Sequence, residues 1–66
     1  MTLYINGEPW ECGGAPTLEE ALRGRVPTDR RYAVLHNGQV IPADQQATVR
    51  LAPEDRVDIV TLAPGG

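Results

Sequence analysis

Two Asn-Gly dipeptides, at residues 6–7 and 37–38, constrain the fold of this chain more than any other feature of its sequence. Asn-Gly is the dipeptide that best tolerates the positive φ angles of a type I′ turn, the turn that joins two antiparallel strands. Strand-like segments rich in β-branched, aromatic and other apolar residues lie before and after each dipeptide. The sequence therefore predicts two β-hairpins, over residues 2–12 and 32–41.

A helix is predicted between the two hairpins. Thr17 and Glu20 have the spacing of a capping box, in which the threonine hydroxyl accepts from the glutamate amide while the carboxylate reaches back to the threonine amide. Gly24 and Pro27 end the helix after about two turns. Three apolar residues follow the cap at helical spacing and form one stripe: Leu18, Ala21 and Leu22.

The last third of the chain supplies one more strand. Residues 43–48 are polar and are expected to be loosely helical or coiled, with Val49 and Leu51 in a short strand after them. Residues 56–62 form the most strongly β-prone segment. A chain ordered as hairpin, helix, hairpin, connection and strand is closed most economically when the last strand lies centrally, parallel to the first.

This order predicts an α+β fold of the β-grasp (ubiquitin-like) type, with a mixed sheet of four to five strands on one main helix. Pro9 lacks an N–H group, so the second strand is expected at a sheet edge. We expect one domain over residues 1–62 and a flexible tail over residues 63–66, which read Ala-Pro-Gly-Gly.

Composition excludes several classes of function. Cys12 is the single cysteine and His36 the single histidine, so the chain has no disulfide framework, no Cys/His nucleophile pair and no metal site. The net charge is −3 and the six basic residues are arginines scattered along the chain, which argues against nucleic acid as a partner. No segment has the length of a membrane span or the order of a signal peptide, so we expect no membrane partner and a cytoplasmic location.

The chain resembles the ThiS family, the sulfur carrier proteins of thiamin thiazole biosynthesis. The resemblance rests on LYINGEPWE at the start, on HNGQVIP in the second hairpin, and on LAPEDRVDIVTLAPGG, with its terminal Gly-Gly. Pro64 before the two glycines, and Pro53-Glu54-Asp55 where members often carry a glycine before the acid, depart from the family pattern. Neither departure touches the terminal carboxylate.

The resemblance implies a noncatalytic carrier that binds no cofactor. An E1-like adenylyltransferase of the ThiF type would use ATP to adenylate the carboxylate of Gly66, and sulfur from a cysteine desulfurase or a rhodanese would then replace AMP. The product would be 1-thioglycine at position 66, a thiocarboxylate that donates its sulfur to a thiazole synthase of the ThiG type. Gly65 and Gly66 lack a Cβ, so they suit a narrow adenylation channel.

Strand alternation predicts where such partners dock. If Leu3, Ile5 and Val57 face the helix, neighbouring residues face away from it. Four of these are expected to form an apolar patch on the solvent side of the sheet, and Ala63 and Pro64 are expected to extend the contact. The four are Tyr4, Leu35, Val60 and Leu62.

Three other functions remain open from the sequence. The same terminal chemistry would suit a carrier for molybdopterin synthesis or for tRNA thiolation. A ubiquitin-like modifier would join Gly66 to lysines of other proteins; the chain itself has no lysine, which would prevent chains of modifier but not single attachment. A plain interaction module would use its sheet alone.

Overall fold

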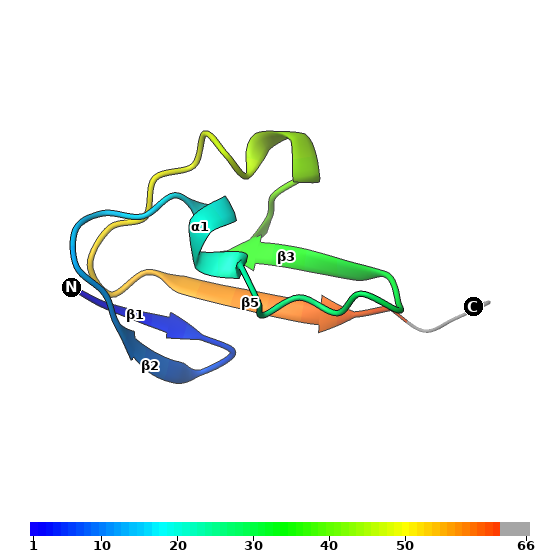
Figure 1. Ribbon diagram of the computed structural model, residues 1–66, viewed down its shortest axis with the longest axis horizontal. Helices are drawn as coiled ribbons and strands as arrows, with labels where there is room; N and C mark the ends of the chain where they lie inside the picture. The colour runs from blue at the N-terminus through cyan, green and yellow to red at the C-terminus, as the bar shows by residue number, and fades with distance from the viewer. Residues whose placement is uncertain (63–66) are drawn as a thin grey trace.

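One short helix covers one face of a five-stranded sheet in the computed structural model, which describes residues 1–62 (Figure 1). The helix, α1, spans Leu18–Leu22. The sheet has the order β2-β1-β5-β3-β4. Its strands are β1 (Thr2–Ile5), β2 (Glu8–Glu11), β3 (Tyr32–His36), β4 (Gln39–Val40) and β5 (Arg56–Thr61). The predicted tail, residues 63–66, lies outside the described residues.

The last strand is the centre of the sheet, as predicted. β5 runs parallel to β1 and antiparallel to β3, so it joins the two hairpins into one sheet. β2, which contains Pro9, is an edge strand because within residues 1–62 it pairs with β1 alone. The β-grasp prediction is confirmed, including the mixed sheet and its central parallel pair.

Both Asn-Gly turns have the predicted left-handed backbone. Asn6 has a φ of 53° and Gly7 of 82°, and Asn37 has a φ of 51° and Gly38 of 85°. Positive φ angles at both central residues are the mark of a type I′ turn, whose twist matches that of the flanking strands. The two hairpins form where the sequence predicts them, although each ends one residue earlier than expected.

The helix begins with the predicted capping box but is shorter than expected. The amide of Glu20 donates to Thr17 Oγ1 at 3.2 Å, and the amide of Thr17 donates to Glu20 Oε1 at 3.1 Å. The backbone bond from Thr17 holds the pKa of Glu20 below its ordinary value. After five residues the chain leaves the helix, since Arg23 has a ψ of 126°, outside the helical region, and Gly24 takes a φ of 73°. The predicted helix length of about two turns is therefore wrong, since α1 has five residues.

The connection between β4 and β5 contains no regular strand. A 3-10 helix spans Ala43–Gln45, within the segment predicted as loosely helical. The strand expected at Val49 and Leu51 is wrong: a single bridge between Thr17 and Arg50 replaces it. Here the backbone pairs with the helix entry rather than with the sheet, since the amide of Leu51 donates to the carbonyl of Pro16 at 2.9 Å.

The core lies between the helix and the sheet. Alternation along the strands is as predicted for Leu3, Ile5 and Val57, which are buried. Val34 of β3 is buried beside them. Leu18, Ala21 and Leu22 from the helix and Leu51 from the connection complete the buried set. Within residues 1–62 no three His, Cys, Asp or Glu side chains lie close enough to hold a metal ion together. No helix in that range is both long and apolar enough to span a membrane.

Candidate functional site

The residues predicted to carry the chemistry follow directly after β5. Gly65 and Gly66, with Ala63 and Pro64, lie outside the described residues, so their roles stay predictions. The strand that leads to them is tied to the sheet up to its end, because the amide of Leu62 donates to the carbonyl of Arg31 at 3.0 Å. The fold therefore holds the last described residue beside the start of β3.

An apolar strip crosses the face of the sheet that points away from the helix. In the strand register Val60 lies opposite Ala33, and Leu35 lies between Asp58 on β5 and Val40 on β4. Val60 keeps 46% of its surface exposed and Val40 keeps 60%. We call this set the apolar strip: Ala33, Leu35, Val40, Val60 and Leu62.

Tyr4 lies apart from the apolar strip. Its partner on β5 is Arg56, four residues before Val60. At the usual rise of a strand this places the two positions about 13 Å apart. Asp58 faces the same side between them. The structure thus brings three of the four predicted side chains to one end of the outer face and leaves the fourth beside an arginine.

Val40 belongs to the strip but was missed by the sequence reasoning. A signal for it was present. A two-residue turn at Asn37-Gly38 pairs Leu35 with Val40, and paired residues share a face, so an outward Leu35 requires an outward Val40. Val40 is the most exposed large apolar side chain among the described residues.

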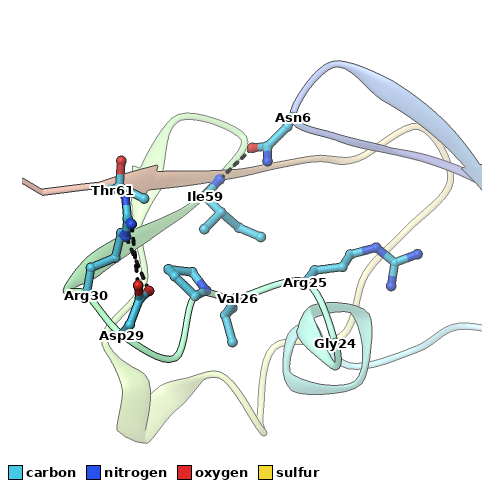
Figure 2. Close-up of a pocket in the computed structure, with 9 residues that line it drawn as sticks. Asn6, Gly24, Arg25, Val26, Asp29, Arg30, Ile59 and Thr61 are labelled. Carbon is cyan, nitrogen blue, oxygen red and sulfur yellow. Dashed lines mark hydrogen bonds and ion pairs between the residues drawn. The ribbon is translucent and has the colours of Figure 1, made fainter.

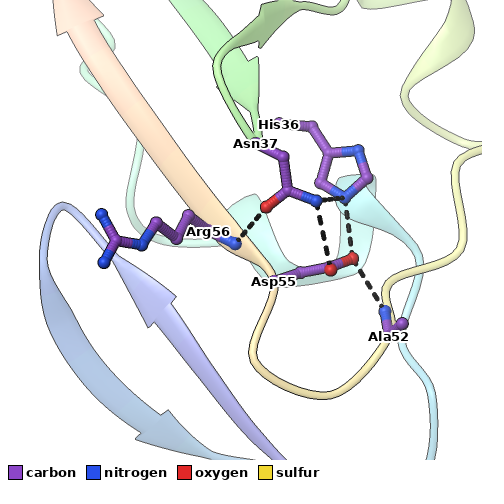
Figure 3. Close-up of polar contacts among 5 residues, drawn as sticks. All are labelled: His36, Asn37, Ala52, Asp55 and Arg56. Atoms are coloured by element: carbon purple, nitrogen blue, oxygen red, sulfur yellow. Dashed lines mark hydrogen bonds and ion pairs between the residues drawn. The ribbon is translucent and has the colours of Figure 1, made fainter.

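A second feature that sequence reasoning missed is a polar network at the start of β5 (Figure 3). The Asp55 carboxylate lies 2.8 Å from Nε2 of His36, and it accepts from the amide of Ala52 at 2.9 Å and from Nδ2 of Asn37 at 3.2 Å. The Asn37 oxygen accepts from the amide of Arg56 at 2.8 Å. These contacts join the second hairpin to the turn before β5.

The electrostatics of this network favour an ionised Asp55. Burial disfavours the charged carboxylate, but the hydrogen bonds from Ala52, His36 and Asn37 outweigh it, so the pKa of Asp55 lies below its ordinary value of 3.8. His36 contacts Asp55 through Nε2, with its side chain 21% exposed. The arrangement fastens the turn before β5 to the second hairpin.

Comparison with known proteins identifies relatives along the whole chain. The model of the ThiS family matches residues 3–66. A thiazole synthase of Magnetococcus marinus is 30% identical over 66 residues, which are all of this chain and 20% of that protein. This chain therefore corresponds to about a fifth of that enzyme. An uncharacterized protein, ycf40, of Porphyra purpurea is 27% identical over 66 residues and is covered to 93%.

A solved structure shares the fold over its full length. The thiamine biosynthesis protein (ThiS) from Geobacter metallireducens superposes with a TM-score of 0.83 at 25% sequence identity. Each chain is covered completely by the other. The architecture and the family match thus agree over the same residues.

Proposed function

Because the chain belongs to the ThiS family, the small sulfur carrier proteins of thiamin biosynthesis, we propose that the carboxyl group of Gly66 is the atom group that carries the sulfur. The observation that supports this most is the family match, which extends through Gly65 and Gly66. In this proposal the chain is a co-substrate of other enzymes and catalyses no step itself.

The first step activates the carboxylate. A carboxylate is a poor electrophile, so one of its oxygens attacks the α-phosphorus of ATP and pyrophosphate leaves, which forms an acyl-adenylate. A sulfur nucleophile then forms a bond to the carbonyl carbon, and the bond to AMP breaks. With a persulfide donor, a thiol reductant cleaves the remaining S–S bond, and 1-thioglycine is left at position 66.

Glycine at the last two positions suits this chemistry. An activating site has to surround the carboxylate closely, and any Cβ on Gly66 would crowd the carbon under attack. Gly65 can adopt backbone angles that other residues avoid, so the segment can pass through a narrow channel. ATP belongs to the activating enzyme, an E1-like adenylyltransferase, and the carrier binds no cofactor of its own.

A thiazole synthase is the acceptor that one relative favours. The Magnetococcus marinus protein of that name contains a region similar to this entire chain, and proteins that are joined in one chain often act together. The apolar strip is the surface we propose for docking on the activating enzyme. Exposed apolar side chains that gather on one face commonly mark such a surface.

The test of the carrier chemistry is the intact mass of the protein from its native cells. We expect a fraction heavier by about 16 Da, the difference between sulfur and oxygen, that maps to Gly66 and reacts with an alkylating reagent. If Gly66 is instead found in isopeptide bonds to lysines of other proteins, the protein is a modifier and the carrier proposal is wrong.

A paired variant tests the role of Gly66 in activation. Gly66→Ala should reduce ATP–pyrophosphate exchange by the adenylyltransferase sharply. The control is Gly13→Ala, because a Cβ at Gly13 would meet no atom within 4 Å and the backbone of Gly13 does not have a positive φ. Equal exchange by the two variants would contradict the proposal.

Val60→Asp tests the docking surface. A charge on the apolar strip should weaken binding to the adenylyltransferase, while stability stays within about 0.5 kcal/mol of the parent because the site is exposed. Tyr4→Asp is the matched control on the same face outside the strip. A larger loss of affinity in the Tyr4 variant than in the Val60 variant would show that the adenylyltransferase binds the other end of this face.

A further inference from the structure

The side of β5 that faces β1 is covered along only half of its length. β1 pairs with β5 through Tyr4 opposite Arg56 and Ile5 opposite Val57, and it ends there. At Asn6 the chain turns away with a φ of 53°. The Asn6 amide still donates to the carbonyl of Val57 at 2.9 Å, and its side-chain oxygen accepts from the amide of Ile59 at 2.8 Å.

Beyond this contact three backbone groups of β5 point to a place where no strand lies. The bonds from Asn37 to Arg56 and from Leu62 to Arg31 show that even-numbered residues of β5 bond to β3. Odd-numbered residues therefore direct their N–H and C=O groups to the opposite side. Among residues 1–62 no partner is present there for the carbonyl of Ile59 or for the amide and carbonyl of Thr61.

A groove of about 460 Å³ opens beside these groups (Figure 2). Asn6, Ile59 and Thr61 line it from the sheet. The loop between α1 and β3 lines it from the other side, with the apolar side chains of Val26 and Pro27 and the polar side chains of the residues around them. The groove is open enough to admit an extended chain next to the free edge.

The loop at the groove is the basic part of an acidic protein. Residues 23–31 contain four arginines and one aspartate, a formal charge of +3, whereas the whole chain has −3 and the other residues therefore sum to −6. Asp29 pairs with Arg30 at 3.3 Å, and both side chains are mostly exposed. Two of the four arginines line the groove: Arg30, which pairs with Asp29, and Arg25, whose guanidinium lies 4.4 Å from the centroid of the Trp10 ring and donates to the carbonyl of Ala21 at 3.2 Å. The positive charge of the loop as a whole still exceeds that of its one aspartate, so the loop favours a negatively charged occupant of the groove beside it.

We propose that the edge of β5 from Ile59 to Thr61 is a docking site for an extended, acidic segment of a partner protein, which adds to the sheet as a further strand. The segment supplies N–H, C=O and N–H groups to the three unpaired groups of β5, as in other cases of strand addition. Its acidic side chains face the arginines of the loop. The site uses the backbone of Ile59 and Thr61 at the strand edge, whereas Val60 between them contributes its side chain to the apolar strip on the outer face. It does not depend on sulfur chemistry at Gly66.

The test uses Thr61→Pro, with Thr61→Val as its matched control. Proline removes the amide that the added strand needs, yet it leaves the pairing with β3 intact because that amide points the other way. Valine keeps the amide and the strand preference. The probe is an acetylated seven-residue peptide of alternating glutamate and valine, titrated into ¹⁵N-labelled protein and followed by NMR.

The peptide should shift the amide signals of Asn6, Ile59 and Thr61. Thr61→Pro should weaken its binding about tenfold, the scale of one lost hydrogen bond with added steric conflict, while Thr61→Val should bind like the parent. The same peptide with lysine in place of glutamate should bind more weakly than the acidic one.

Three results would overturn the proposal. The first is equal affinity of Thr61→Pro and Thr61→Val for the peptide. The second is the absence of any shift at Ile59 and Thr61 up to the solubility limit of the peptide. The third is protection of the Thr61 amide that rises with protein concentration in the absence of peptide, which would make a second copy of this chain the occupant. If Thr61→Pro does not fold, a peptide methylated on alternate backbone nitrogens takes its place with the parent protein. That peptide should lose binding, and unchanged binding would also overturn the proposal.

Discussion

The two Asn-Gly turns have the same sequence and the same backbone but leave the central strand in different states. Each asparagine takes a φ near 50°, and each side-chain oxygen accepts an amide of β5 at 2.8 Å, from Ile59 for Asn6 and from Arg56 for Asn37. Each asparagine thus fastens its hairpin to β5 twice, through the side-chain oxygen and through the backbone amide, which donates to the carbonyl of Val57 from Asn6 and to that of Arg56 from Asn37.

The surroundings of the two asparagines differ. Asn37 also donates to Asp55, which in turn contacts His36 and the amide of Ala52, so the start of β5 is held from several sides. Asn6 makes its one side-chain bond beside a free edge. The side-chain bond of Asn37 is one of several polar contacts that hold the start of β5, whereas the side-chain bond of Asn6 stands alone. After Asn6, the backbone groups on this edge of β5, from the Ile59 carbonyl to Thr61, therefore stay without a partner strand among residues 1–62.

The largest effect is expected from Asn37→Gly. Glycine keeps the positive φ, so the variant loses the side-chain bonds to Arg56 and Asp55 while the turn geometry survives. We expect the free energy of unfolding to fall by about 2 kcal/mol, the sum of two modest hydrogen bonds, in a urea titration. A loss no larger than that of Asn6→Gly would show that the Asp55 network adds nothing to the turn.

Asp55→Asn should have the next largest effect, and it should depend on pH. A carboxyl group whose pKa is lowered in the folded state stabilises the fold fully above its unfolded value of 3.8, and this stabilisation is lost as the pH falls through the lower folded value. At pH 7 the variant should be less stable by about 1 kcal/mol. The difference should shrink below pH 3.8, as followed by thermal unfolding across the pH range. A difference that stays constant down to pH 2 would contradict the lowered pKa.

Asn6→Gly should have the smallest effect. The backbone change matches that of Asn37→Gly, but one exposed hydrogen bond is lost, so the cost should be about 1 kcal/mol or less. Hydrogen exchange gives the sharper measurement. The Ile59 amide should exchange faster in this variant while the Arg56 amide is unchanged, and Asn37→Gly should show the reverse order.

The sequence predicts the local parts of this fold well. Each hairpin depends on a dipeptide that favours one turn type, and the helix start depends on Thr17 and Glu20, which are three residues apart. The central position of β5 follows from connection rules, since a single strand after two hairpins has one economical place. These predictions need no knowledge of side-chain packing.

The parts that could not be predicted depend on contacts between distant residues. Alternation assigns each residue to a face but does not set the register between strands from different hairpins, so Tyr4 was grouped with Val60 although β1 reaches β5 only at Arg56 and Val57. The Asp55–His36 contact joins residues 19 apart in the sequence, and neither residue belongs to a local motif. The strand prediction at Leu51 is wrong because this residue is buried through its contact with the segment before the helix, and such a contact has no periodic pattern in the sequence.

The central position of β5 also has a consequence for how the chain folds. Both hairpins are synthesised before the strand that joins them, and an isolated two-stranded hairpin is at best marginally stable in water. The sheet can therefore close only when β5 inserts between β1 and β3, which requires contacts such as Ile5 with Val57, far apart in the sequence. Folding should be a single late event, slow for so small a chain, because the entropy of closing that long loop is lost before the core gains its contacts.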